Sequence, residues 1–221
     1  MDGLYGEEGI LVFENFKKSG SDIGSEVREN NKSDFPDFFN SREQNCYALE
    51  KEPVTYLENV DMQNHELDVV ESGEKFFDRN NSHEVGNYGE MKTDQDLRTK
   101  GYERISNEMV TDIDENGHQG LDGVYYNAEG HPQYLIVDAK YGSAKLNPNT
   151  ADGKQMCDNW IDNRLDKDLG KEKADEIRLE KLFNPDNVGA YVAHVDENGN
   201  VSYDKLDGNA NVIEKGVNIY E

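Results

Sequence analysis

Two short strand-like runs constrain the fold of this chain more than any other feature. They span residues 121–126 and 134–140, and a turn-rich stretch joins them. If the two runs form a hairpin centred near Gly130, Asp122 falls opposite or almost opposite Asp138. The sequence therefore predicts two carboxylates on neighbouring strands at the same level of a sheet.

The predicted pairing has a chemical consequence. Directly opposed positions bring Cβ atoms within about 4.5–5.5 Å of each other, and two carboxylates at that separation repel unless a cation lies between them. Side chains alternate between the faces of a strand, so Lys140 points the same way as Asp138. A divalent metal with a lysine beside it is the simplest explanation, and the pattern indicates an active site.

Each of these residues also has a purely structural interpretation. Asp122 could be a turn residue beside Gly120 and Gly123. Asp138 and Lys140 could form an ordinary exposed pair on a strand. Aspartate within an apolar strand is disfavoured by strand propensity, which argues against the second interpretation.

Composition divides the chain near residue 84. Residues 1–84 carry 20 acidic and 8 basic side chains and few sustained apolar runs, whereas residues 85–221 carry 27 and 15. The overall hydrophobic content of 34% is below the roughly 45–50% of globular proteins when glycine is counted. We therefore predict an acidic, loosely structured linker or accessory region over 1–84 and a folded domain over 85–221.

Helix and strand signals alternate within residues 85–221. Two capping boxes, Asn87 with Glu90 and Asp152 with Gln155, predict helix starts. The predicted elements are a helix ending near residue 101, a strand within 105–113, the hairpin, helices over 152–170 and 171–183, and strands over 188–195 and 201–203. This order indicates a mixed α/β (α+β) domain.

The candidate residues suit phosphodiester hydrolysis. Asp122, Asp138 and Lys140 fit the pattern D…(D/E)-x-K, and Glu90 adds a carboxylate on a preceding predicted helix. Hydrolysis builds negative charge on the phosphate oxygens, and a hard cation held by two carboxylates and a main-chain carbonyl offsets that charge. A lysine beside the cation can orient the attacking water, lower its pKa or stabilise the pentacovalent phosphate.

The segments 120–125 and 137–142 resemble the PD-(D/E)xK superfamily of restriction-endonuclease-like nucleases. Over about residues 85–185 the chain also resembles C-terminal nuclease domains of bacterial polymorphic toxins, including LXG toxins of Gram-positive type VII systems and contact-dependent inhibition toxins. The additional blocks that carry this resemblance are 88–92, 117–120, 153–156 and 160–161. One departure is Leu121, which stands where the superfamily pattern has proline.

The resemblance implies a restriction-endonuclease-like core, a mixed sheet with flanking helices. It implies a DNase that is secreted or delivered from the producing bacterium, acts in the target-cell cytoplasm and is neutralised by a cognate immunity protein. It implies a requirement for Mg²⁺ or Mn²⁺, held by Asp122, Asp138 and the carbonyl of Ala139. Lys140 would position the nucleophilic water, and Glu90 would have an outer or second-metal role.

Two interpretations stay open for the flanking polar residues. His118 or Gln119 could touch the phosphate or the water, and Gln155 could complete the site. All three could equally be loop and capping residues. The basic residues that could line a cleft, or be scattered surface charges, are Lys92, Arg98, Arg104, Lys145, Lys154 and Arg164.

Other functions remain open at this point. An RNase on the same scaffold would have the same metal site. The net charge of −24 disfavours nucleic-acid binding at long range and suits an acidic, metal-binding interaction module without catalysis. Residues 112–117 begin like an EF-hand calcium loop, but Gly123 stands where the bidentate glutamate is required, and a turn is the better interpretation.

Two targeting features are not found in the sequence. No segment approaches the roughly 18 apolar residues needed to span a membrane, and the chain does not begin with a cationic and then apolar signal peptide. The sequence does not predict an oligomeric state.

Overall fold

Strand β3 (Tyr134–Tyr141) lies at the centre of a six-stranded sheet. Its first six residues are all buried, which agrees with the apolar run over residues 134–137 and makes Asp138, the fifth residue of the strand, a buried carboxylate. The strand order is β1-β2-β3-β4-β5-β6, with β1 Glu103–Arg104, β2 Gly123–Tyr126, β4 Val188–Val195, β5 Val201–Leu206 and β6 Val212–Glu214. Only β3 and β4 pair in parallel, so the sheet is mixed.

The computed structural model describes residues 56–117 and 120–219, which belong to the unit Tyr56–Glu221. Four α-helices are described: residues 56–71, α3 Ser82–Thr99, α4 Asp158–Leu169 and α5 Lys171–Phe183. A short 3₁₀ helix, η1 Pro185–Asn187, leads into β4. The predicted mixed α/β class is confirmed.

The β2–β3 hairpin has the predicted register. Gly123 pairs with Val137 in an antiparallel ladder, and continuing this register by one residue sets Asp122 opposite Asp138. The two carboxylates are therefore neighbours at the end of the hairpin farthest from its turn.

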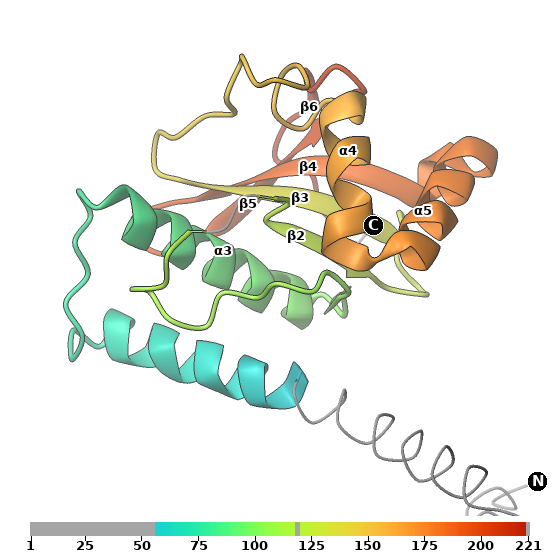
Figure 1. Cartoon of the computed structure of the whole chain (residues 1–221). Coiled ribbons are helices and arrows are strands. Elements are labelled where there is room, and N and C mark those ends of the chain that lie inside the picture. The colour runs from blue at the N-terminus through green and yellow to red at the C-terminus, as the bar shows by residue number, and fades with distance from the viewer. Residues whose placement is uncertain (1–55, 118–119, 220–221) are drawn as a thin grey trace, which may run out of the picture. The chain divides into compact units, whose positions relative to one another are not determined.

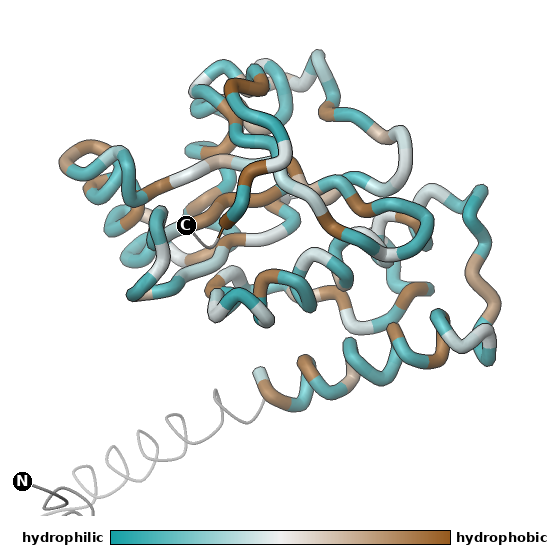
Figure 2. Tube along the Cα trace, turned by 180° about the vertical axis from the view of Figure 1, so that it is seen from behind, coloured by the Kyte–Doolittle hydropathy of each residue, from teal (hydrophilic) through white to brown (hydrophobic). Residues whose placement is uncertain are grey.

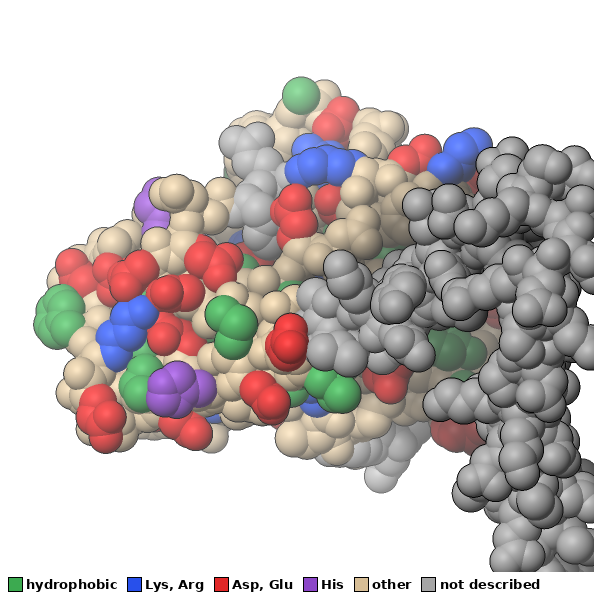
Figure 3. All heavy atoms as spheres, turned by 60° about the horizontal axis from the view of Figure 1, so that its bottom comes forward, with side chains coloured by type: hydrophobic (Ala, Val, Ile, Leu, Met, Phe, Trp, Pro, Cys, Tyr) green, Lys and Arg blue, Asp and Glu red, His purple; other side chains and the backbone are tan. Residues whose placement is uncertain are grey.

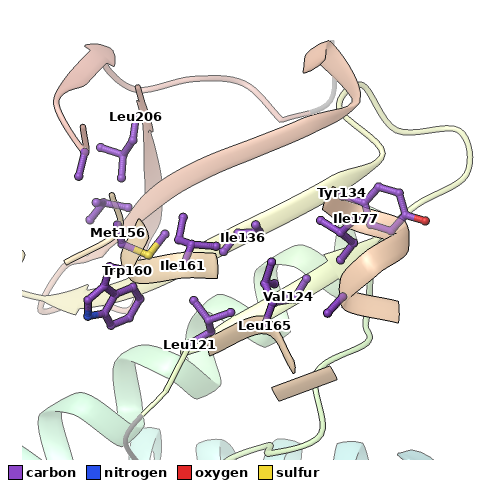
Figure 4. Close-up of a cluster of buried hydrophobic side chains, with 13 residues drawn as sticks. Leu121, Val124, Tyr134, Ile136, Met156, Trp160, Ile161, Leu165, Ile177 and Leu206 are labelled. Atoms are coloured by element: carbon purple, nitrogen blue, oxygen red, sulfur yellow. The ribbon is translucent and has the colours of Figure 1, made fainter. Parts of the chain in front are cut away.

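The two faces of the sheet are covered by different helices (Figure 1). One face carries Val124, Ile136 and Val192, which pack with Trp160 of α4 and Ile177 of α5. Figure 4 shows this cluster with side chains from β2, β3 and both helices pointing toward one another. Burial of these large apolar side chains stabilises the sheet at about 25 cal/mol per Å² removed from water.

The opposite face packs against α3. Leu135, Val137 and Tyr191 pack with Leu97 of α3, and the helix backbone at Gly89 lies beside β3. Hydrophobic stretches follow the strands through the middle of the unit, while the outer loops are mostly hydrophilic (Figure 2). The central strands β2, β3 and β4 are thus buried on both faces along most of their length, whereas β6 is exposed.

Both predicted helix starts are wrong. Helix α3 begins at Ser82, because Asn81 is its N-cap and accepts a hydrogen bond from the His83 N–H. Asn87 lies inside the helix and donates to main-chain carbonyls of the loop around residue 114. Helix α4 begins at Asp158 rather than near Asp152, so Gln155 lies in the preceding loop.

Several other predicted elements are confirmed. The helix over 171–183, the strand over 188–195 and the hairpin that follows it are present. The predicted strand within 105–113 is wrong: β1 ends at Arg104, and the chain from there to residue 117 is irregular.

Residues 56–71 form a helix where the sequence suggested a loose segment. Leu67 and Val70 of this helix pack with Tyr88 and Met91 of α3. The division predicted between residues 84 and 85 therefore falls inside one packed unit. Residues 1–55 lie outside the described residues. None of the described helices has both the length and the apolar composition needed to cross a membrane.

The segment 112–117, which begins like an EF-hand calcium loop, binds the side-chain ammonium group of Lys75. Lys75 Nζ lies 2.7 Å from an Asp112 carboxylate oxygen, 3.0 Å from Asp114 and 2.5 Å from Glu66. An ammonium group thus neutralises the carboxylates that a calcium site would require, which agrees with the turn interpretation.

Candidate active site

Asp138, Lys140 and Gln155 come together at the C-terminal end of β3. Asp138 is fully buried. Gln155 Nε2 donates to its Oδ1 at 2.5 Å, and Lys140 Nζ forms an ion pair with its Oδ2. Lys140 Nζ also lies 3.2 Å from the Ala139 carbonyl oxygen. Gln155 therefore reaches the site even though the capping role predicted for it is wrong.

Asp122 is fixed on the neighbouring strand. Its Oδ2 accepts a hydrogen bond from the Ala139 N–H at 2.9 Å, and its main-chain carbonyl accepts one from Arg104 Nη2 at 2.6 Å. The preceding residue is anchored as well, since the Leu121 N–H donates to Asp168 of α4 at 2.8 Å. Contacts to three different elements hold Asp122 beside Asp138.

Glu90 approaches the same site from α3. Burial raises the pKa of its carboxyl group well above the ordinary value, and the negative charges of Asp122, Asp94 and Asp138 raise it further. The charges of Asp122 and Asp138 contribute to this pKa, so Glu90 lies within electrostatic range of both. The structure brings together Asp122, Asp138 and Lys140 of the predicted set. Among the described residues the carboxylates of Glu90, Asp122 and Asp138 do not converge as a metal-binding group, so Glu90 is not placed as a third carboxylate ligand.

The site has an excess of negative charge. Burial raises the pKa of Asp138 to about 8, the charge of Asp122 adds to this effect, and Lys140 opposes it. For Lys140, burial alone would lower the pKa, but the carboxylates of Asp138, Asp122 and Glu90 outweigh that effect and raise it. Lys140 is the cation beside Asp138 and Asp122, and the buried Arg104 guanidinium lowers the pKa of Glu90.

The donor set fits a hard divalent cation. Two carboxylates and a main-chain carbonyl are oxygen ligands of the kind that Mg²⁺ takes. The raised pKa of Asp138 reflects its burial first and the charge of Asp122 second. In the part of the chain described, no three His, Cys, Asp or Glu side chains are grouped so that they could hold a metal ion by themselves. The expected set differs from such a group because its third ligand is the Ala139 carbonyl. Lys140 now contacts two of the expected ligand oxygens, so cation binding requires that it move from them.

A buried hydrogen-bond network centred on Asp94 lies next to the site and contacts it through Arg104. Asp94 of α3 accepts hydrogen bonds from Arg104 at 2.8 Å, Tyr125 at 2.6 Å and Gln63 at 2.8 Å. Arg104 extends this network to the Asp122 carbonyl. Sequence reasoning treated Arg104 as a possible cleft residue and missed the others, because the members lie on separate elements and none has a motif spacing.

Gly123 makes room for this network. A Cβ at this position would lie 2.3 Å from the Tyr125 hydroxyl, so any side chain would displace the ring from Asp94. The glycine next to Asp122 is therefore required by packing.

Most of the other predicted basic residues are engaged within the protein. Lys92 pairs with Glu71, and Arg98 bonds to Gln63 and Asn64. Lys154 donates to the Ala210 carbonyl, Arg164 pairs with Asp152, and Lys145 is exposed. His118 and Gln119 lie outside the described residues.

Comparisons with protein-family models, with curated protein sequences and with solved structures find no match to this chain.

Proposed function

We propose that residues 85–221 contain a metal-dependent nuclease of the restriction-endonuclease-like PD-(D/E)xK type. The observation that carries the proposal is the fully buried Asp138, which lies beside Asp122 and Lys140 with a pKa raised to about 8. A buried carboxylate with excess negative charge around it destabilises the fold, and such groups gather at functional sites. An exposed structural ion pair would not require this burial.

The proposed roles follow from the contacts. Asp122, Asp138 and the Ala139 carbonyl would hold Mg²⁺ or Mn²⁺, and Gln155 fixes the orientation of the Asp138 carboxylate. A bound divalent cation would supply positive charge to offset the negative charge that develops on the phosphodiester. The neighbouring carboxylates raise the pKa of Lys140 and so favour its charged form, and Lys140 would position the attacking water beside the phosphate. Glu90 would act as an outer or second-metal carboxylate.

The biological setting rests on the sequence resemblance. On that basis the substrate is DNA, the protein is a toxin delivered in interbacterial competition, and a cognate immunity protein neutralises it. RNA is the alternative substrate, because the site addresses only the phosphodiester group that both polymers share.

A non-catalytic acidic module is a second candidate, and one observation favours it. Asp and Glu side chains are widespread on the face shown in Figure 3, where Lys and Arg are fewer, and the net charge is −24. Such a surface repels nucleic acid at long range. In the nuclease proposal, substrate binds elsewhere, at the end of β3.

Cleavage assays separate these candidates. Supercoiled plasmid and total RNA are incubated with the full chain in Mg²⁺, Mn²⁺ or EDTA, beside Lys140→Ala. Lys215→Ala is the matched control, because Lys215 is an exposed lysine that follows β6. Metal-dependent loss of plasmid that Lys140→Ala lacks supports the DNase, and loss of RNA alone supports the RNase. A folded protein that cuts neither polymer contradicts the nuclease proposal.

A further inference from the structure

The sheet face that carries Asp138 and Lys140 continues onto the next strands. In the parallel β3–β4 ladder, Lys140 pairs with His194, and in the β4–β5 ladder Val192 pairs with Asp204. Paired residues of adjacent strands lie about 4.8 Å apart and share a face. The residue directly opposite His194 on β5 is Ser202, and Asp204 lies diagonally across from His194 on the same face. Lys140, His194 and Asp204 therefore form an oblique polar row across three strands.

This row begins where the helices cease to cover the sheet. Ile136 and Val192 on the same face are buried against α4 and α5. Two positions farther along β4, His194 has a side chain that is 39% exposed, whereas the Asp204 side chain is 15% exposed. The histidine is thus accessible from solvent at the level of Lys140.

Asp204 fixes the imidazole ring. His194 Nε2 lies 3.3 Å from Asp204 Oδ2. A carboxylate that accepts from one ring nitrogen sets the orientation of the ring and the role of the second nitrogen. The aspartate is largely buried on the strand beside the histidine, so the pair holds the ring in place. When His194 is an imidazolium, Nε2 donates to Asp204 and the second ring nitrogen is a donor that faces away from Asp204.

We propose that His194, oriented by Asp204, contacts the phosphate backbone of the nucleic acid beside the phosphodiester on which Lys140 acts. This inference rests on the proposed nuclease function and extends its site onto β4 and β5. The chain has a net charge of −24, which repels the negatively charged phosphate backbone of the substrate. Hydrogen-bond donors near the scissile phosphate offset that repulsion locally. His194 is a substrate-contacting residue, and Asp204 is its positioning residue.

The test separates KM from kcat. His194→Ala raises KM for the polymer that the wild type cuts by about tenfold, the loss expected for one hydrogen bond to a charged group, and changes kcat little. His194→Gln retains an N–H donor and restores part of the loss. Asp204→Asn also raises KM, but by less than His194→Ala, because the imidazole ring keeps a neutral and weaker hydrogen-bond partner.

His131→Ala is the matched control. His131 is an exposed histidine before β3, at the opposite end of the strand from Lys140, and its replacement leaves KM unchanged. A wild-type KM in His194→Ala overturns this inference alone, and so does an equal loss in His131→Ala. Wild-type protein that cuts neither DNA nor RNA overturns the proposed function, and this inference with it.

Discussion

Replacing Asp138 by asparagine should change how stability depends on pH. The pKa of Asp138 rises from 3.8 to about 8 in the folded protein, chiefly through burial. Because the folded state holds the proton more tightly than the unfolded state, the carboxyl group destabilises the fold increasingly as pH rises from about 4 to about 8. Asparagine is neutral throughout and keeps an oxygen for Gln155.

The size of the effect follows from the pKa. Each pKa unit is worth about 1.4 kcal/mol, so the rise from 3.8 to about 8 corresponds to a difference in unfolding free energy on the order of 6 kcal/mol. Urea unfolding of wild type and Asp138→Asn, followed by circular dichroism in EDTA across this range, measures it. We expect the variant to gain stability relative to wild type as pH rises.

The comparison between the two proteins reports Asp138 together with the groups coupled to it. Carboxyl groups outside the site titrate alike in both proteins and cancel in the difference, whereas the pKa values of Glu90 and Lys140 respond to the Asp138 charge. A difference in unfolding free energy that stays constant between about pH 4 and about pH 8, or one that moves in favour of the wild type, refutes the reasoning.

Two further predictions concern the cation and the supporting network. Above about pH 8, where Asp138 is ionised, Mg²⁺ at about 100 times its Kd should stabilise the folded wild type by about 2.7 kcal/mol. The same concentration should have little effect on Asp138→Asn. Equal stabilisation of both proteins in thermal melts would place the ion elsewhere. Arg104→Met should destabilise the fold by about 3–5 kcal/mol because it leaves the buried Asp94 without its charged partner; urea unfolding close to that of wild type would contradict the role given to this pair.

The centre of the fold was predictable because its signal is local. Two short strand-like runs with a turn centred near Gly130 predict the register that sets Asp122 against Asp138, and the observed pairing of Gly123 with Val137 agrees with it. Lys140 follows from period-two geometry on the same strand. The roles assigned to these residues remain predictions.

The helix starts were less predictable because one motif occurs twice. Asn81 with Glu84 has the same spacing as Asn87 with Glu90. The structure uses the first pair, in which Asn81 Nδ2 also donates to Glu84 at 2.7 Å. Nothing local distinguishes the two pairs, and the choice depends on packing of the whole helix.

The helix over 56–71 was missed because its buried face is partly polar. Gln63 lies on that face with Leu67 and Val70, and it is fully buried because Asp94 and Arg98 satisfy its amide. A buried glutamine interrupts the apolar periodicity by which a helix is identified. Its partners lie on α3, so the sequence gives no sign that the position is internal.

Plasmid cleavage by Lys140→Ala, beside wild type and Lys215→Ala, decides whether the chain is a metal-dependent nuclease with Lys140 in its site; circular dichroism verifies that each protein is folded. We expect wild type and Lys215→Ala to cut the plasmid in Mg²⁺ or Mn²⁺ and not in EDTA, while folded Lys140→Ala is inactive. Full cleavage by Lys140→Ala, or cleavage that persists in EDTA, would contradict it.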